Sequence, residues 1–213
     1  MLSKRVVIFS GGNLDPGDLG LLRPDDYIIG ADHGALFLVR HGIRPDISLG
    51  DFDSVPAETL DEITAASGRV IACDAVDKDL TDSEMALDMA LEREPEEILM
   101  LGVTGTRLDQ TLASVQMLKR ALERQVPCFI KDRNNYIMLT GSQAMVRDLG
   151  YTYVSLLPLT PEVTGITLEG FQYPLHDATL RLGQSLAVSN RLLGESGTVS
   201  IRSGLLLIIQ SKD

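Results

Sequence analysis

Over its first 130 residues the chain alternates short apolar runs with amphipathic stretches, and this alternation constrains the fold more than any other feature of the sequence. The runs are nearly continuous in apolar residues, as in strands that are covered on both faces of a sheet. Strands that alternate with helices form a parallel, doubly wound sheet with right-handed crossovers. The expected strands are residues 5–10, 27–31, 47–50, 69–73, 97–102 and 127–131.

Helix signals lie between these runs. Thr81-Asp82-Ser83-Glu84 has the form of a capping box and predicts a helix that continues to about residue 93. Pro56 suits the first turn of another helix. Residues 108–122 predict a third helix, whose apolar face carries side chains three or four positions apart: Leu108, Leu112, Val115, Leu118 and Leu122.

After about residue 134 the helical periodicity fades and short β-like runs dominate. Turn residues separate them at a spacing typical of an antiparallel sandwich or barrel. We therefore expect an α/β fold class, with an N-terminal Rossmann-like parallel-sheet domain (residues 1–133) followed by a C-terminal all-β sandwich domain (residues 134–213). The expected strands of the second domain are residues 136–140, 153–157, 166–169, 179–182, 186–189, 198–202 and 205–210.

The negative charge of the chain is concentrated in the first domain. The chain has 30 acidic and 19 basic residues, a net charge of −11, and residues 1–133 hold 24 of the acids and 14 of the bases. Of the 30 acids, 19 are Asp, which belongs at caps, turns and ligand sites more than on helix faces. This acidity argues against a surface for nucleic acid or anionic lipid, because both require clustered positive charge.

The two cysteines give no sign of a disulfide or a metal site. Cys73 and Cys128 lie in apolar runs without CxxC or Cys/His spacing, and we expect both to be buried thiols. No apolar run approaches the ~20 residues of a membrane span. The apolar run at the N-terminus is too short for a signal peptide. We therefore expect a cytoplasmic protein.

Six Asp residues follow expected strands of the first domain. In an open parallel sheet the carboxyl ends of the strands lie along one edge, and ligands bind in the crevice outside that edge. We therefore expect carboxylates from four strand ends to converge on one crevice. They are Asp32, Asp51, Asp53, Asp79, Asp82 and Asp109.

Converging carboxylates repel one another and stay ionised only beside a counter-charge. Mg²⁺ supplies such a charge, and it commonly uses one or two carboxylates together with substrate phosphates and water. Arg107 and Lys78 are the basic residues nearest the cluster, and both suit phosphate. The sequence therefore predicts a magnesium–polyphosphate site, with close backbone approach allowed by Gly34, Gly50, Gly102 and Gly105.

Each of these features also has a purely structural interpretation. A single Asp after a strand is usually a helix N-cap, and an Asp-x-Asp pair occurs by chance in many loops. Ser10-Gly11-Gly12 lacks the spacing of a dinucleotide-binding loop and more often marks a tight turn. No His has a partner at a useful spacing, so a catalytic His is not expected. The prediction therefore depends on the conjunction of the sites.

The motifs resemble those of the thiamine pyrophosphokinase family. The match extends over most of the chain, with order and spacing kept. The segments that carry it are Asp32-His33-Gly34-Ala35, Gly50-Asp51-Phe52-Asp53-Ser54, Lys78-Asp79-Leu80-Thr81-Asp82, Gly102-Val103-Thr104-Gly105-Thr106-Arg107-Leu108-Asp109, Gly170-Phe171-Gln172-Tyr173-Pro174-Leu175 and Val188-Ser189-Asn190. The family often has Gly at the positions of His33 and Thr106, and His at that of Gln110, and these departures bear on contacts to the nucleotide.

The resemblance implies transfer of pyrophosphate from ATP to thiamine, giving thiamine diphosphate and AMP, with ATP as co-substrate, Mg²⁺ as cofactor and a homodimer whose sites lie between subunits. It implies three groups of site residues. Asp51, Asp53 and Asp82 would hold Mg²⁺, and Ser189 and Asn190 would contact thiamine. Nucleotide and phosphates would be bound by Asp32, Gly34, Lys78, Thr81, Thr104, Arg107 and Asp109.

Three points stay open at the level of the sequence. The general base is not identified, although a carboxylate such as Asp79 is a candidate. Another magnesium-dependent phosphotransferase or phosphohydrolase, including one that forms an aspartyl-phosphate, would share the Asp-x-Asp pair but release ADP or inorganic phosphate. A regulatory module that binds nucleotide or thiamine without turnover would form no AMP.

Overall fold

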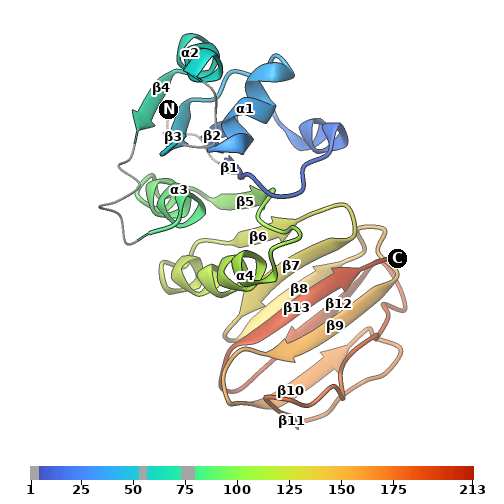
Figure 1. The fold of residues 1–213 in the computed structure, drawn as a ribbon. Helices are drawn as coiled ribbons and strands as arrows, with labels where there is room; N and C mark the ends of the chain where they lie inside the picture. Colours follow the sequence, from blue (N-terminus) through green and yellow to red (C-terminus); the bar gives the residue numbers. More distant parts are fainter. Residues whose placement is uncertain (1–4, 53–56, 73–79) are drawn as a thin grey trace. The chain divides into compact units, whose positions relative to one another are not determined.

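The computed structural model of the protein describes residues 5–52, 57–72 and 80–213 (Figure 1). The chain forms two units, Met1–Asp132 and Arg133–Asp213. Among the described residues no helix is long and apolar enough to cross a membrane.

In its described part, the first unit contains a sheet of six parallel strands in the order β4-β3-β2-β1-β5-β6. Each of these strands falls within a run that the apolar pattern predicts, so the parallel-sheet prediction is confirmed. The strands are β1 (Arg5–Phe9), β2 (Tyr27–Ala31), β3 (Ile47–Gly50), β4 (Arg69–Ala72), β5 (Glu97–Leu101) and β6 (Cys128–Lys131).

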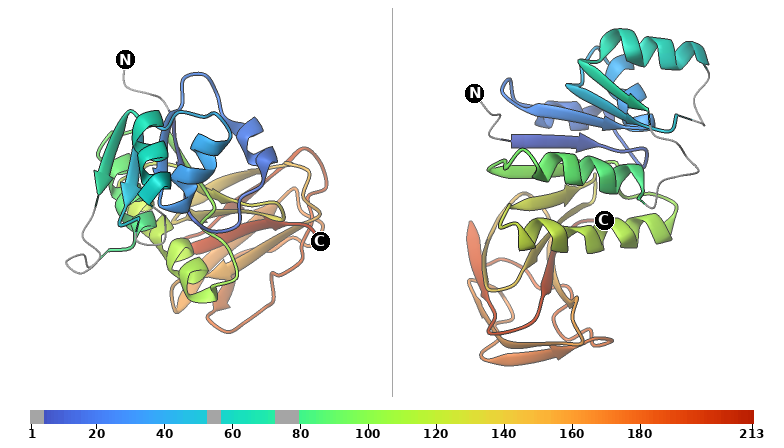
Figure 2. Two further views of the ribbon diagram at one scale, coloured as in Figure 1. Left: turned by 45° about the horizontal axis from the view of Figure 1, so that its top comes forward. Right: turned by 90° about the vertical axis from the view of Figure 1, so that its left-hand side faces the viewer.

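Helices cover both faces of this sheet. Leu38 of α1 packs in one cluster with Val7 and Phe9 of β1. Val6 and Ile8, which alternate with them and point to the other face, are also fully buried. Figure 2 shows the helices around the strands, with α3 and α4 in contact with each other. The helices are η1 (Pro16–Leu21, 3-10), α1 (His33–Arg40), α2 (Ala57–Ala66), α3 (Asp82–Leu91) and α4 (Leu108–Glu123).

The buried face of α4 differs from the predicted one. Leu118 is buried as expected, but Leu108 and Leu112 are 66% and 53% exposed. The buried positions follow the side that faces the sheet and α3, and they include Ser114 and Met117. Spacing identifies an apolar stripe on a helix, but it does not decide which of two neighbouring stripes contacts the core.

The sheet order creates a crevice at one edge. β1 lies between β2 and β5. The chain that leaves β1 returns to the sheet as β2 on one side of β1, whereas the chain that leaves β5 returns as β6, on the other side. The two connections diverge at this point, and open α/β sheets bind ligands in the gap. Both connections begin with small residues, Ser10-Gly11-Gly12 after β1 and Gly102-Val103-Thr104 after β5.

The second unit contains strands without helices, as predicted for an all-β domain. Its antiparallel strands have the orders β7-β13-β9 and β11-β10-β12-β8. Side chains from both sets, such as Leu156, Ile208, Leu168 and Val199, form one buried cluster. The strands are β7 (Asn135–Thr140), β8 (Gln143–Arg147), β9 (Tyr153–Pro158), β10 (Glu162–Glu169), β11 (Ala178–Arg181), β12 (Ser196–Ser200) and β13 (Leu206–Ser211).

Two strand assignments differ from the prediction. The predicted strand at residues 186–189 is wrong, because Leu186 and Val188 are exposed and Ser189 has a φ of 62°, which interrupts an extended chain. β8 was not predicted. It is an edge strand of its sheet, and Val146 is the one buried residue among its five, so its sequence shows little apolar alternation.

Candidate active site

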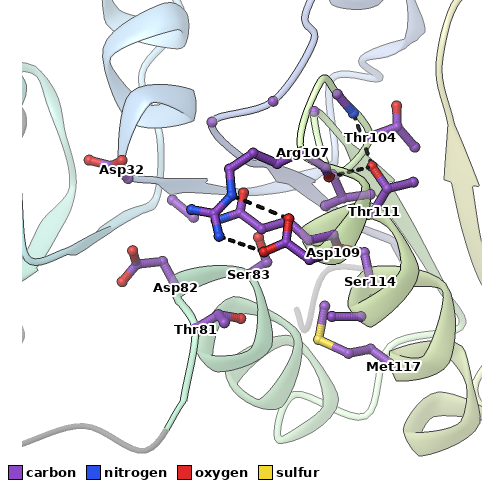
Figure 3. Close-up of a pocket in the computed structure, with 18 of the residues that line it drawn as sticks. Asp32, Thr81, Asp82, Ser83, Thr104, Arg107, Asp109, Thr111, Ser114 and Met117 are labelled. Carbon is purple, nitrogen blue, oxygen red and sulfur yellow. Dashed lines mark hydrogen bonds and ion pairs between the residues drawn. The ribbon is translucent and has the colours of Figure 1, made fainter.

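A cavity of about 670 Å³ lies in the first unit at the carboxyl ends of β1 and β5 (Figure 3). The loops that follow β1, β2, β3 and β5 contribute to it, together with the first turns of α3 and α4. The side chains labelled in Figure 3 are Asp32, Thr81, Asp82, Ser83, Thr104, Arg107, Asp109, Thr111, Ser114 and Met117.

Four of the six predicted carboxylates line this cavity. They are contributed by Asp32, Asp51, Asp82 and Asp109, which come from four separate segments of the chain. For these four, the expected convergence at the sheet edge is confirmed. Asp53, Asp79 and Lys78 lie outside the described residues.

Asp32 has an unusual backbone and an unusual carboxylate. It is the N-cap of α1 with φ 50° and ψ −120°, a conformation that costs an L-residue about 1–3 kcal/mol and is concentrated at functional sites. Its Oδ2 lies 2.9 Å from Nδ1 of His33, while within the described residues its buried Oδ1 has no hydrogen-bond partner. His33 therefore orients the carboxylate through Oδ2, and Oδ1 is a buried acceptor without a partner among the described residues.

Arg107 and Asp109 form a two-pronged ion pair at the rim of the cavity. Nη2 and Nε of Arg107 donate to Oδ2 and Oδ1 of Asp109 at 2.5 and 3.3 Å. The hydrogen bond from Arg107 lowers the pKa of Asp109, and the same bond raises the pKa of Arg107. Both side chains are about two-thirds exposed, so the pair is hydrated and open to exchange with an incoming anion.

The loops after β1 and β5 are joined by their main chains and form one wall of the cavity. Gly12 N–H donates to Gly102 O at 2.6 Å, and Asn13 N–H donates to Thr104 O at 2.8 Å. A Cβ on Gly12 would lie 2.4 Å from Thr104 O and 2.5 Å from Gly102 O. Both N–H groups therefore already donate to main-chain oxygens of the protein. The Gly-Gly turn allows the two loops to pack closely, and these N–H groups are not available to bind phosphate.

Side-chain hydrogen bonds hold the remaining walls. Thr104 Oγ1 donates to Asp132 Oδ2 at 2.8 Å, which ties the loop after β5 to the end of β6. Thr81 caps α3 by accepting from Glu84 N–H at 3.2 Å, as the capping motif predicts, although the Glu84 side chain pairs with Arg120 instead of returning to the cap. Asp132 was not among the predicted site residues, although it directly follows the predicted strand at residues 127–131, the same signal that identified the other Asp residues.

Gly34 lies beside the cavity, not among the residues that line it in the described structure. A Cβ at this position would lie 2.0 Å from Phe9 O, so α1 approaches the end of β1 too closely for any side chain. Packing thus accounts for this glycine.

Ser189 and Asn190 belong to the second unit. Ser189 N–H donates to Ser155 Oγ at 3.0 Å. Asn190 is 4% exposed, and its side chain hydrogen-bonds the main chain of Tyr173. Sequence reasoning placed Tyr173 in a motif but gave it no role; its exposure, 61%, is visible only in the structure.

The side chains that line the cavity are chemically suited to bind phosphate groups and a metal ion. Carboxylates suit a divalent cation, the Arg107 guanidinium suits phosphate oxygens, and the apolar side chains of Val103 and Met117 offer a surface for a ring. Among the described residues, no group of three or more His, Cys, Asp or Glu side chains is placed to hold a metal.

Two family models match the chain. The model described as the catalytic domain of thiamin pyrophosphokinase matches residues 20–130. The model described as the vitamin B1 binding domain of thiamin pyrophosphokinase matches residues 144–206. The boundary between the two matches falls near the division between the two units.

Known thiamine pyrophosphokinases are similar to the chain over its full length. The thiamine pyrophosphokinase of Bacillus subtilis (strain 168) is 34% identical over 214 residues, covering 99% of this chain and 100% of the relative. Its crystal structure superposes with a TM-score of 0.91 at 33% identity, covering 99% and 100% of the two chains. The thiamin pyrophosphokinase of Geobacillus thermodenitrificans gives a TM-score of 0.89 at 36% identity, covering 98% of each chain.

Proposed function

The chain belongs to the thiamine pyrophosphokinase family, and we propose that it carries out the reaction of this family with Mg²⁺ in the cavity of its first unit. The enzyme transfers the pyrophosphoryl group of ATP to thiamine and produces thiamine diphosphate and AMP. The observation that best supports the proposed site is the convergence of Asp51, Asp82 and Arg107 on one cavity where the strand order diverges.

The carboxylates of the cavity are suited to Mg²⁺. The ion needs only one or two protein carboxylates when phosphates and water complete its shell, so Asp51 and Asp82 suffice without a third described ligand. We propose that Asp53, from the same Asp-x-Asp pair, joins them. Mg²⁺ would neutralise charge on the triphosphate, which an acidic cavity otherwise repels.

The protein groups bind and orient the triphosphate. We propose that Arg107 grips phosphate oxygens and that Asp109 holds the guanidinium in place until ATP arrives. Thr104 and Thr81 shape the walls on either side. Asp32, Gly34 and Lys78 complete the proposed nucleotide-binding set.

The proposed chemistry is an in-line displacement at phosphorus. The hydroxyl oxygen of thiamine bonds to the β-phosphorus, the bond between the α- and β-phosphates breaks, and AMP leaves. Positioning and charge neutralisation provide most of the rate enhancement in such transfers. We propose that Asp79 accepts the hydroxyl proton, so the proposed catalytic carboxylates are Asp51, Asp53, Asp79 and Asp82.

We further propose a division of labour within the chain. Residues 1–133 would form a Rossmann-like domain for ATP and Mg²⁺, and residues 134–213 a sandwich domain for thiamine and dimerisation, with Ser189 and Asn190 at the thiamine site. The match of the vitamin B1 binding model supports this. Exposed apolar side chains in the second unit, such as Leu182, Leu186 and Leu193, support a homodimer. Consumption of ATP and the free thiol of Cys128 support the cytoplasm as the compartment.

The test is incubation of the protein with ATP, Mg²⁺ and thiamine, followed by chromatography. We expect AMP and thiamine diphosphate in equal amounts, and none when EDTA is present. Release of ADP or inorganic phosphate would instead identify a different phosphotransferase, and binding without products would identify a regulatory module.

Substitution tests the metal site. Asp53→Asn should reduce turnover to near background with an unchanged melting temperature, because it removes a charge from the metal site without changing side-chain size. Turnover at the wild-type rate in this variant would exclude Asp53 from the metal site.

A further inference from the structure

Two serine hydroxyls join the start of α3 to the end of β1. Ser83 Oγ donates to Ser10 Oγ at 3.0 Å, although the two residues are 73 positions apart in the chain. Ser83 lines the active-site cavity together with its neighbours Thr81 and Asp82 (Figure 3). The sequence gives neither serine a role in function, because Ser10 marks a turn and Ser83 lies inside the capping motif. The pair is therefore a contact beside the cavity that neither motif explains.

Ser10 is a fixed point at the carboxyl end of β1. It is 3% exposed, and its N–H donates to the oxygen of Leu101, the last residue of β5, at 2.9 Å. Its main chain is confined from two sides, because a Cβ on Gly34 would lie 2.8 Å from its nitrogen and a Cβ on Gly102 would lie 2.3 Å from its oxygen. The Ser10 hydroxyl therefore holds its place relative to β1 and β5, and it can fix a segment that bonds to it.

The first turn of α3 carries one of the carboxylates proposed for the metal. Asp82 and Ser83 are the first two residues of this helix, and Thr81 caps it by accepting from Glu84 N–H. The ion pair of Glu84 with Arg120 joins the turn to α4, whereas the Ser83 hydroxyl joins it to the end of β1. Because adjacent residues of one helical turn move together, the position of Ser83 on the strand end also sets the position of Asp82.

We propose that Ser83 and Ser10 are positioning residues for the divalent cation, and that their hydrogen bond fixes the carboxylate of Asp82 in the cavity that Asp51 also lines. This proposal rests on the proposed function, which supplies Mg²⁺ and the triphosphate. Mg²⁺ requires a nearly ideal octahedral shell at about 2.0–2.1 Å, whereas Ca²⁺ accepts a flexible shell at about 2.3–2.6 Å. Loss of the hydroxyl pair should therefore weaken the binding of Mg²⁺ more than that of Ca²⁺.

The test measures, by titration calorimetry, the binding of α,β-methylene-ATP, an analogue that cannot be cleaved between its α- and β-phosphorus atoms, with excess Mg²⁺, excess Ca²⁺ or EDTA. Ser83→Ala should raise the dissociation constant of the Mg²⁺ complex about fivefold, within the worth of one hydrogen bond, and that of the Ca²⁺ complex less than about twofold. The variant keeps the ion pairs of α3 with Arg120, so the helix should stay folded. Ser83→Thr retains a hydroxyl and should bind both complexes as the wild type does.

Ser67→Ala is the matched control for loss of a hydroxyl pair. Ser67 Oγ lies 2.8 Å from Ser48 Oγ, so this change also removes a contact between two serines of the first unit, but neither is among the described residues that line the cavity. Both dissociation constants should stay at their wild-type values in this variant, even if its melting temperature falls. Equal weakening of the Mg²⁺ and Ca²⁺ complexes in Ser83→Ala, or no weakening of either, would overturn the proposal.

A double-mutant cycle tests whether the two serines act as a pair. Ser10→Ala should also weaken the Mg²⁺ complex, and the double variant with Ser83→Ala should bind it no more weakly than the weaker single variant, because both changes remove one hydrogen bond. Additive losses would show that the serines act separately and would refute the pair. If the wild type binds the Mg²⁺ complex but forms no AMP, the proposed reaction fails, and the dissociation constants still decide the role of the pair. If the wild type binds the nucleotide equally well with Mg²⁺ and with EDTA, the metal site and this proposal fail together.

Discussion

Replacement of Gly12 by Ala should destabilise the wall of the active-site cavity. The new Cβ would lie 2.4 and 2.5 Å from two main-chain oxygens, and neither oxygen can rotate away as a side chain could. Relief of the clash requires the loops after β1 and β5 to separate, which breaks the hydrogen bonds Gly12 N–H to Gly102 O and Asn13 N–H to Thr104 O. Each is worth about 0.5–1.5 kcal/mol, so with strain we expect a loss of about 2–3 kcal/mol.

The assay is thermal unfolding monitored by circular dichroism, together with steady-state kinetics. For a chain of this length, the loss corresponds to a fall in melting temperature of about 5–10 °C. KM for ATP should rise, because the displaced loop carries Thr104 and leads to Arg107. Gly20→Ala is the matched control: a Cβ there meets no atom within 4 Å, so stability should change by less than about 0.5 kcal/mol. A Gly12→Ala variant with wild-type melting temperature and KM would refute the steric argument.

Three further predictions concern single side chains. Thr104→Val removes the hydroxyl that donates to Asp132, so it should raise KM for ATP about fivefold; Thr104→Ser should behave as wild type, and additional loss in a Thr104→Val, Asp132→Ala double variant would contradict a shared contact. Arg107 lowers the pKa of Asp109, so any stability from this pair is present at neutral pH and is lost as the pH falls through the lowered pKa. An NMR titration of the wild type should give a pKa for Asp109 below the ordinary carboxyl range, and Arg107→Gln should return it to that range. Burial raises the pKa of Cys128 to about 12, so in a Cys73→Ser variant the remaining thiol should react with Ellman's reagent at pH 8 only after unfolding, and rapid reaction of the native protein would show that this thiol is accessible.

The sequence alone was sufficient to locate the described strands of the first unit. Strand periods and turn residues are local signals, and the runs at residues 27–31 and 47–50 coincide with β2 and β3. Parallel strands place their carboxyl ends on one edge by geometry, so the convergence of Asp32, Asp51 and Asp82 also followed before any coordinates were known. The family motifs identified the chemistry for the same reason: they are short and contiguous.

Local signals were insufficient where packing decides. Helix α1 was not predicted, because its eight residues, His33-Gly-Ala-Leu-Phe-Leu-Val-Arg, form a short apolar run, and periodicity in so short a run does not separate a helix from a buried strand. The Leu108 and Leu112 stripe of α4 was expected to be buried, yet the sheet and α3 contact the neighbouring stripe. For α4, the neighbouring elements and not the local spacing determine which stripe is buried.

What each polar side chain binds was decided by the tertiary structure. Thr104 and Asn190 belong to motifs that predict ligand contacts, but their side chains are engaged by Asp132 and Tyr173, 28 and 17 positions away. Pairs this distant depend on how strands and loops are brought together, and no local pattern encodes them. The sequence therefore determined which chemical groups the protein has at its site, while the fold decided which of them are held for ligands and which hold the site in shape.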